Sequence, residues 1–195
     1  MRLLLATTNP HKATEVRAML AGTPFVIETL ADHPHLPEPG EDGDTFEANA
    51  LQKAREIHAH ARVPVIADDS GLEVTALDGA PGVHSRRFSP EATHEANNAL
   101  LLARLDGRTD REARFVCVLA LVTEGWEGTA RGACPGRIVD APRGAAGFGY
   151  DPVFEPDELG GRTMAEATMV EKNAISHRGR AFAQLPTLLR RAGML

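Results

Sequence analysis

The sequence predicts an α/β fold with a mixed sheet flanked by helices, and two observations lead to this class. Apolar runs typical of strands alternate with segments of helical spacing along all 195 residues. No break in composition, internal repeat or low-complexity segment interrupts that alternation. We therefore predict a single domain over residues 1–195, arranged as two lobes around a central cleft.

The first part of the chain is expected to hold two strands and two helices. Residues 2–7 and 25–30 are apolar runs typical of strands, and the segment after Lys12 has helical spacing. Asp44 and Glu47 form a capping box, which predicts that the second helix begins there.

Polar residues follow at defined spacing on this second helix and after it. Asn49 and Lys53 lie four residues apart and therefore share a helix face. Residues 63–67 predict a short strand and residues 72–76 another, so the intervening Asp68-Asp69-Ser70-Gly71 is expected to be a loop. Alternation would send the two aspartates to opposite sides.

The second half of the chain continues the pattern. It predicts a helix from Ser89 to about Leu105 and strands over 115–122 and 126–133. A glycine-rich stretch over 144–154 follows, then a capping box of Thr163 with Glu166 and a last helix capped by Ser176. These boundaries rest on Gly, Pro and capping residues that flank apolar runs.

Composition argues against several classes of protein. There are 27 acidic and 21 basic residues, a net charge of −6 and no long basic run, so no nucleic-acid binding is expected. The apolar start, residues 3–6, is too short for a signal peptide or a membrane span, and no membrane association is expected. Cys117 and Cys134 are too few for a disulfide framework and favour a cytoplasmic location.

The basic residues are very unequally divided. Lys12, Lys53 and Lys172 are the only lysines, and all the other basic residues are arginines. A lysine ammonium is a compact point charge that suits a single phosphate oxygen in a tight site, whereas the guanidinium is planar and larger. The three lysines are therefore candidate phosphate contacts, with chance as the alternative explanation.

Two segments near the N-terminus could carry chemistry. Thr7-Thr8-Asn9-Pro10-His11-Lys12 offers backbone N–H groups and a lysine at a helix start, which suits phosphate; a plain Asn/Thr turn is the alternative. The carboxylates from Glu41 to Glu47 and those of Asp68-Asp69 suit a hard cation such as Mg²⁺; a solvated helix cap and an Asx turn are the alternatives.

Two later segments are candidates for nucleotide contacts. In Gly147-Phe148-Gly149-Tyr150-Asp151 the glycines allow a ligand to approach the backbone and the aromatic residue could stack on a base, although hairpins show the same alternation. The run from Glu171 to Arg178 gathers a lysine, an imidazole and a guanidinium around a helix N-cap, with a solvated charged face as the alternative. No histidine pair has the spacing of a metal site.

Taken in order, these segments resemble the inosine/xanthosine triphosphate pyrophosphatase family, which acts on noncanonical purine nucleoside triphosphates. The matching pieces are Thr7-Thr8-Asn9 with Lys12 and Glu15, residues 45–50 with Lys53-Ala54, and residues 67–74, 79–83, 147–154 and 165–178. All three lysines fall inside these pieces, which favours the phosphate assignment over chance.

The resemblance implies an ITPase-like fold, a homodimer, and Mg²⁺-dependent hydrolysis of ITP, dITP or XTP to the monophosphate and pyrophosphate. Carried over by position, Asp69 is the general base, and Glu41 and Asp69 hold the metal. The implied substrate contacts are Thr7, Thr8, Asn9, Pro10, His11, Lys12, Lys53, Ser70, Phe148, Gly149, Tyr150, Asp151, Lys172, His177 and Arg178, with Phe148 against the base.

Two departures from the family pattern and two rival functions remain. Thr8 stands where the family commonly has glycine, and His84-Ser85-Arg86-Arg87-Phe88 stands where Tyr-Ser-Ala-Arg-Tyr is usual. One rival function is a nucleotide sensor without catalysis, which would need no base such as Asp69. The other is a related hydrolase that acts on modified pyrimidine or methylated nucleotides, or on sugar phosphates.

Overall fold

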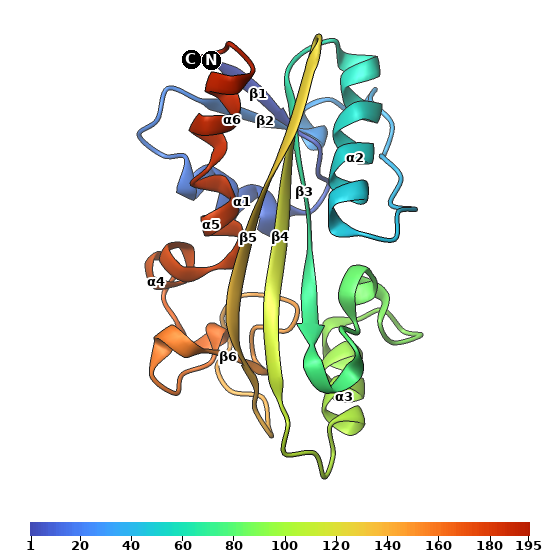
Figure 1. The fold of residues 1–195 in the computed structure, drawn as a ribbon, viewed down its shortest axis with the longest axis vertical. Helices are drawn as coiled ribbons and strands as arrows, with labels where there is room; N and C mark the ends of the chain where they lie inside the picture. The colour runs from blue at the N-terminus through green and yellow to red at the C-terminus, as the bar shows by residue number, and fades with distance from the viewer. The chain divides into compact units, whose positions relative to one another are not determined.

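The computed structural model describes all 195 residues and has one six-stranded sheet in the order β2-β1-β3-β4-β5-β6 (Figure 1). The strands are β1 (Arg2–Leu5), β2 (Val26–Thr29), β3 (Val65–Val74), β4 (Glu112–Thr123), β5 (Trp126–Ile138) and β6 (Phe154–Pro156). Strand β1 pairs in parallel with β2 and β3, whereas β5 pairs antiparallel with β6. The predicted mixed sheet is confirmed.

Six α-helices accompany the sheet: α1 (Pro10–Met19), α2 (Phe46–Ala61), α3 (His94–Arg104), α4 (Met169–Ile175), α5 (His177–Phe182) and α6 (Leu185–Arg191). Short 3₁₀ turns, such as the one over Met164–Glu166, lie between them. The capping box of Thr163 with Glu166 is confirmed, and it opens this turn rather than a longer helix. No helix combines the length and the apolar character that a membrane crossing requires.

The chain divides into two compact units, in agreement with the predicted two lobes. The first unit comprises residues 1–69, 117–132 and 179–195, and the second comprises 70–116 and 133–178. The boundaries within β3, β4 and β5 mean that each of these long strands contributes residues to both units. The central nucleotide cleft stays a prediction.

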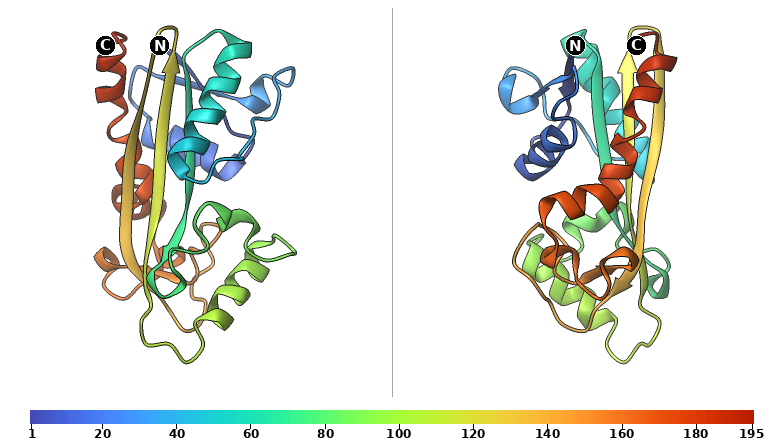
Figure 2. Two further views of the ribbon diagram at one scale, coloured as in Figure 1. Left: turned by 45° about the vertical axis from the view of Figure 1, so that its right-hand side comes forward. Right: turned by 90° about the vertical axis from the view of Figure 1, so that its left-hand side faces the viewer.

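In the first unit, helices pack on both faces of the strands. Val16 of α1 and Leu185 of α6 share one apolar cluster with Leu3, Leu5 and Ile66. Helix α2 covers the opposite face (Figure 2), and its buried stripe of Phe46, Ala50, Ala54 and Ile57 is the one that the 3.6-residue spacing predicts. Two helix layers thus enclose the strand segment that carries Asp68 and Asp69.

The second unit has its own core. Leu101 and Leu105 from the region of α3 pack with Phe115 of β4 and Phe154 of β6. Phe115 and Phe154 meet edge to face, with ring centroids 4.7 Å apart. The glycine-rich stretch 144–154 joins this core through Phe154, its last residue. Phe154 begins β6, a strand that sequence reasoning did not predict.

The predicted loop between two strands at Asp68-Asp69 is wrong, because β3 runs without interruption from Val65 to Val74. Both aspartates are buried inside this strand, with 2% and 7% of their surface exposed. An aspartate rarely occupies a strand interior unless its charge is paired. Lys12 and Lys53 supply that pairing, which the local sequence could not indicate.

Three helix boundaries also differ from the prediction. Thr45 rather than Asp44 caps α2, because the Thr45 hydroxyl accepts the Ala48 N–H at 3.1 Å. Thr93 caps α3, and the predicted start at Ser89 is wrong because Ala92 has a positive φ of 52°. The last predicted helix is two short helices, α5 and α6, and the second has a proline in its first turn.

Candidate active site

In the first unit, Asp68 and Asp69 each meet a different lysine. Lys12 of α1 lies 3.0 Å from Asp68 Oδ2, and Lys53 of α2 lies 3.0 Å from Asp69 Oδ1. The two helices flank opposite faces of β3, so the predicted divergence of the two side chains is confirmed. Adjacent carboxylates thereby receive separate partners.

Asp69 has the more elaborate surroundings of the two. Its Oδ2 accepts a hydrogen bond from Asn49 Nδ2 at 3.1 Å, in addition to the Lys53 contact at Oδ1. Asn49 and Lys53 come from the same face of α2, as their spacing of four residues predicts. Two donors from one helix therefore fix the orientation of the Asp69 carboxylate.

Lys53 also contacts Glu41, whose Oε1 lies 2.9 Å from Nζ. Burial of the ammonium group opposes its charge, but the neighbouring Asp69, Asp68 and Glu41 outweigh it and raise the pKa of Lys53 above 10.5. Lys53 is therefore a cation at neutral pH and joins the two predicted metal ligands.

These residues fit a magnesium ion in the chemistry of their donors. Glu41 and Asp69 supply hard carboxylate oxygens, the donors that Mg²⁺ prefers, and Mg²⁺ commonly takes its remaining ligands from water and substrate phosphates. The structure has no cluster of three or more His, Cys, Asp or Glu side chains in a metal-holding arrangement. A shared cation would compete with Lys53 for the same two carboxylates.

The loop before α1 is organised by Asn9. Its side-chain oxygen accepts the backbone N–H of His11 at 2.9 Å and that of Lys12 at 3.3 Å, which caps the helix. Thr7 accepts the Asn9 N–H, and Pro10 occupies the first turn. The hydroxyl of Thr8, a departure from the family pattern, donates to Glu38 at 3.3 Å.

In the second unit, Arg178 and His177 are buried beside aromatic and polar partners. Arg178, only 1% exposed, donates to the Ser70 hydroxyl at 2.8 Å. The His177 ring stacks on Phe115 with centroids 4.7 Å apart and planes 14° apart. The structure thus brings Ser70 into one unit with His177 and Arg178, which lie more than 100 residues further along the chain.

Phe148 lies beside two cations in the same unit. Lys172 Nζ is 4.7 Å and the Arg178 guanidinium 5.9 Å from the centre of its ring. Lys172 also forms a buried ion pair with Asp151 at 2.6 Å, and Asp151 accepts the Phe148 N–H at 2.8 Å. Asp151 therefore positions both the lysine and the backbone of the aromatic residue.

Tyr150 of the same loop points into the unit. The Tyr150 hydroxyl donates to the Ser85 carbonyl at 2.8 Å, and burial raises the pKa of the phenol. The Ser85 hydroxyl in turn accepts the Leu72 N–H, so the segment that departs from the family pattern at His84 still anchors β3. Tyr150 thus ties its loop to the segment around Ser85, and its contact with substrate stays a prediction.

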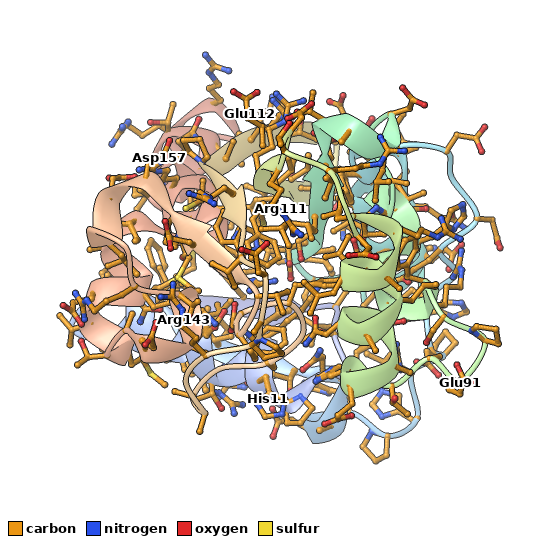
Figure 3. The ribbon with its side chains drawn as sticks, turned by 90° about the horizontal axis from the view of Figure 1, so that it is seen from below. His11, Glu91, Arg111, Glu112, Arg143 and Asp157 are labelled. Carbon is orange, nitrogen blue, oxygen red and sulfur yellow. The ribbon has the colours of Figure 1, made fainter.

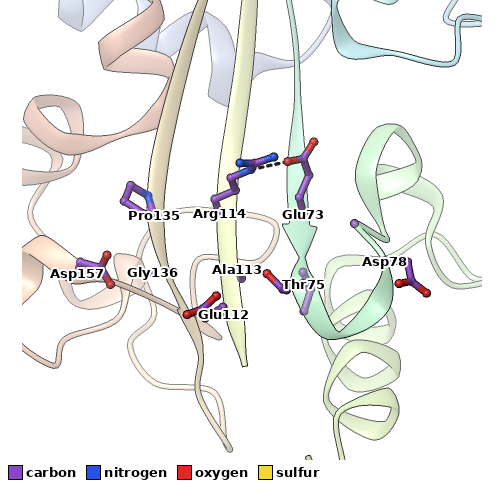
Figure 4. A pocket seen from close by; sticks show the side chains of 11 residues that line it. Glu73, Thr75, Asp78, Glu112, Ala113, Arg114, Pro135, Gly136 and Asp157 are labelled. Atoms are coloured by element: carbon purple, nitrogen blue, oxygen red, sulfur yellow. Dashed lines mark hydrogen bonds and ion pairs between the residues drawn. The ribbon is translucent and has the colours of Figure 1, made fainter. Parts of the chain in front are cut away.

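A separate hollow of about 570 Å³ lies in the second unit, and none of the predicted site residues lines it (Figure 4). Four carboxylates line it, those of Glu73, Asp78, Glu112 and Asp157; Figure 3 also labels the last two. Its arginine, Arg114, already donates to Glu73 at 2.6 Å. This acidic lining would repel a polyphosphate, so we do not place the nucleotide there.

The comparisons with known proteins agree with the motif order. The model of the Ham1 family matches residues 3–188. The chain belongs to the Ham1 family. Among curated relatives of this family, the dITP/XTP pyrophosphatase of Exiguobacterium sp. is 51% identical over 187 residues, 95% of each chain. That of Geobacter sulfurreducens is 50% identical over 188 residues, 94% of each chain.

Solved structures of the family show the same fold. The HAM1 protein of Coxiella burnetii has a TM-score of 0.88 and 38% identity, and the similarity covers 98% of this chain and 99% of that one. The dITP/XTP pyrophosphatase of Mycobacterium abscessus has a TM-score of 0.76 and 47% identity over 95% of this chain and 98% of that one. The predicted ITPase-like α/β fold is confirmed.

Sequence reasoning on this Ham1 family chain left several well-placed residues outside the predicted site. Asn49 holds Asp69, and its spacing from Lys53 was the available signal. Asp68 holds Lys12, and its place next to Asp69 was a signal too. His94 and Asn98 both bond Gly149, and no feature of the sequence predicted that contact.

Proposed function

We propose that this protein hydrolyses the noncanonical purine nucleoside triphosphates ITP, dITP and XTP to the nucleoside monophosphate and pyrophosphate, with Mg²⁺. The observation that carries the proposal is the surroundings of Asp69, a buried carboxylate held by Asn49 and Lys53. Membership of a family with curated dITP/XTP pyrophosphatases supports the substrate class. Removal of such nucleotides would cleanse the nucleotide pool.

The proposed chemistry uses Asp69 as the proton acceptor for the attacking water. Asn49 and Lys53 orient its carboxylate, so that proton transfer needs no reorientation of the base. Lys53 stays cationic because its pKa is raised, and it can offset negative charge on the phosphates. Magnesium bound by Glu41 and Asp69 would neutralise further phosphate charge and lower the pKa of bound water.

Substrate recognition is divided between two sets of residues. Residues 7–12 and Lys53 are assigned to the triphosphate, because Lys12 and Lys53 supply positive charge and Asn9 fixes the helix start that carries Lys12. Lys172 remains a candidate phosphate contact, as its scarcity among the basic residues indicates. The rest of the nucleotide is assigned to Ser70, Phe148, Gly149, Tyr150, Asp151, His177 and Arg178. Phe148 is the residue in this second set that can stack on a base.

The proposal includes a homodimer, which rests on the family pattern, and a cytoplasmic location, which rests on the presence of only two cysteines. Two-fold dimers are the commonest soluble oligomers, which supports the first part. Light scattering tests it across the working concentration range. A single species near the 20.9 kDa monomer mass would contradict the dimer.

A panel of nucleotides assayed for product release tests the activity. ITP, dITP, XTP, GTP, ATP and a modified pyrimidine triphosphate are incubated with and without Mg²⁺, and pyrophosphate is separated from orthophosphate. We expect pyrophosphate from ITP, dITP and XTP, and only when Mg²⁺ is present. Orthophosphate as the product would favour a phosphatase, and binding without turnover would favour a nucleotide sensor.

A further inference from the structure

The segment 147–151, here called the Phe148 loop, contains a conformational weakness. Gly147 and Gly149 flank the aromatic residue, and both have positive φ, +78° and +64°. Glycines at such angles avoid strain, but they also leave a free chain more conformations than other residues do. A ring that is to stack on a nucleotide base needs its backbone held by contacts from elsewhere.

One end of the loop is held by two hydrogen bonds between Phe148 and Asp151. The Phe148 N–H donates to Asp151, and the Asp151 N–H donates back to the Phe148 carbonyl at 3.3 Å. These two bonds close a tight turn, which Lys172 of α4 and the Ala165 N–H hold at Asp151, but none of these contacts reaches Gly149. The Gly149 peptide groups lie within that turn and need partners from outside it.

Helix α3 supplies both of these partners. Asn98 Nδ2 donates to the Gly149 carbonyl at 3.1 Å, and the Gly149 N–H donates to His94 Nδ1 at 3.2 Å. His94 and Asn98 are four residues apart on α3 and therefore share a face. One face of α3 thus hydrogen-bonds both the N–H and the carbonyl of Gly149, the residue next to Phe148.

The two contacts differ in their surroundings. Asn98 is buried, and its Oδ1 has no hydrogen-bond partner. An unsatisfied buried acceptor lowers stability, and the side chain keeps this orientation while Nδ2 bonds Gly149. His94 is exposed, and its ring centre lies 6.4 Å from that of Phe148. Because Nδ1 accepts a bond, the neutral ring carries its proton on Nε2. Removing the exposed imidazole should therefore loosen the loop without opening a cavity in the core.

We propose that His94 is a positioning residue that, together with Asn98, holds the Phe148 loop in the conformation that receives the purine base. This inference rests on the proposed function for the identity of the ligand, but the positioning itself depends only on the contacts of Gly149. His94 touches the loop backbone, and it takes no part in the chemical step. Its loss should weaken substrate binding more than turnover.

The first experiment compares His94→Ala with His94→Asn. The asparagine Oδ1 stands where the histidine Nδ1 does, so this variant keeps an acceptor for the Gly149 N–H, whereas alanine removes it. We expect His94→Ala to raise KM for ITP about threefold to tenfold, the factor that one lost net hydrogen bond gives, with kcat within about twofold. His94→Asn should restore KM. Glu95→Ala, an exposed change on the same helix, is the matched control.

The second experiment measures hydrogen exchange and needs no activity. Exchange of the peptide that covers the Phe148 loop is followed by mass spectrometry in the unmutated protein and in the three variants. We expect faster exchange by about threefold to tenfold in His94→Ala, rates near those of the unmutated protein in His94→Asn, and no change in Glu95→Ala.

The two experiments separate the inference from the proposed function. Failure of the unmutated protein to release pyrophosphate from any purine triphosphate, with the expected exchange pattern present, would overturn the proposed function and leave the positioning role supported. Unchanged loop exchange in His94→Ala would overturn the positioning role. An active protein whose KM stays within about twofold in His94→Ala, or whose KM rises equally in His94→Asn, would overturn the role in binding.

Discussion

Replacing Lys53 with methionine should lower the free energy of unfolding far more than the loss of an exposed surface ion pair does. The change keeps most of the apolar stem and removes the ammonium that contacts Glu41 at 2.9 Å and Asp69 at 3.0 Å. Lys53 is only 4% exposed and Asp69 only 7%, so water cannot replace the lost partner well. Asp69 keeps the Asn49 bond but loses its counter-charge.

The expected magnitude follows from that burial. Breaking a buried ion pair by removing one partner costs about 3–5 kcal/mol, because a charge is left without compensation. We expect a loss at the lower end, about 3 kcal/mol, since Asn49 remains. For a chain of this length, about 1 kcal/mol shifts Tm by roughly 2–4 °C, so Tm should fall by roughly 6–12 °C.

Arg55 of the same helix provides a matched control. It forms a two-pronged ion pair with Glu127, and both side chains are about half exposed, 53% and 43%. Exposed pairs contribute about 0–1 kcal/mol, because water and salt screen them. Arg55→Met should therefore lower the free energy of unfolding by less than about 1 kcal/mol.

Urea denaturation at pH 7.5 measures the difference. Circular dichroism follows the helices, and the fluorescence of Trp126, the single tryptophan, follows the first unit. A Lys53→Met protein within about 1 kcal/mol of the unmutated one, or no less stable than Arg55→Met, would refute the reasoning from burial.

The pH dependence supplies an independent check on the same residue. The folded-state pKa of Lys53 is raised above its unfolded value of 10.5, so the stability it adds is fully present below pH 10.5. That stability is lost as the pH rises through the higher folded-state value. The gap between the unmutated protein and Lys53→Met should therefore be constant from pH 7 to 9 and shrink above about pH 10.5.

Three further predictions concern activity. Asp69→Asn should lower kcat by at least about 10²-fold while circular dichroism shows an intact fold, and near-normal turnover would exclude Asp69 from the chemical step. Lys172→Arg should impair hydrolysis, because the planar guanidinium is larger than the ammonium that lies 2.6 Å from Asp151. Full activity in all three variants, Lys12→Arg, Lys53→Arg and Lys172→Arg, would reject the inference from lysine scarcity. Arg178 can only donate, so a 6-oxo purine offers it an acceptor and adenine does not, and kcat/KM should be lowest for ATP. Guanine shares the 6-oxo group but carries an amino donor at position 2, so kcat/KM for GTP should lie between that for ITP and XTP and that for ATP. One such mismatch costs about 1–3 kcal/mol, and Arg178→Ala should narrow the ITP to ATP gap by slowing ITP; equal kcat/KM for both in the unmutated protein would contradict this.

The sequence alone determined the features that depend on short-range pattern. The apolar runs predicted five of the six strands at least in part, because alternation and apolar runs report which residues face a core. The spacing of Asn49 and Lys53 predicted that they share a face of α2, since helix geometry fixes that relation. The ordered motifs predicted the family, and the family model and the fold confirm it.

Only the tertiary structure decided where the charged residues could be buried. Asp68-Asp69-Ser70-Gly71 has the local composition of a loop, yet it continues β3 because Lys12 and Lys53 arrive from distant helices. Likewise, His94 and Asn98 contact Gly149 across more than 50 residues of sequence, and neither carries a local signal for that role. Pairing energies of this kind depend on which elements pack together, and that information is absent from any short window of the chain.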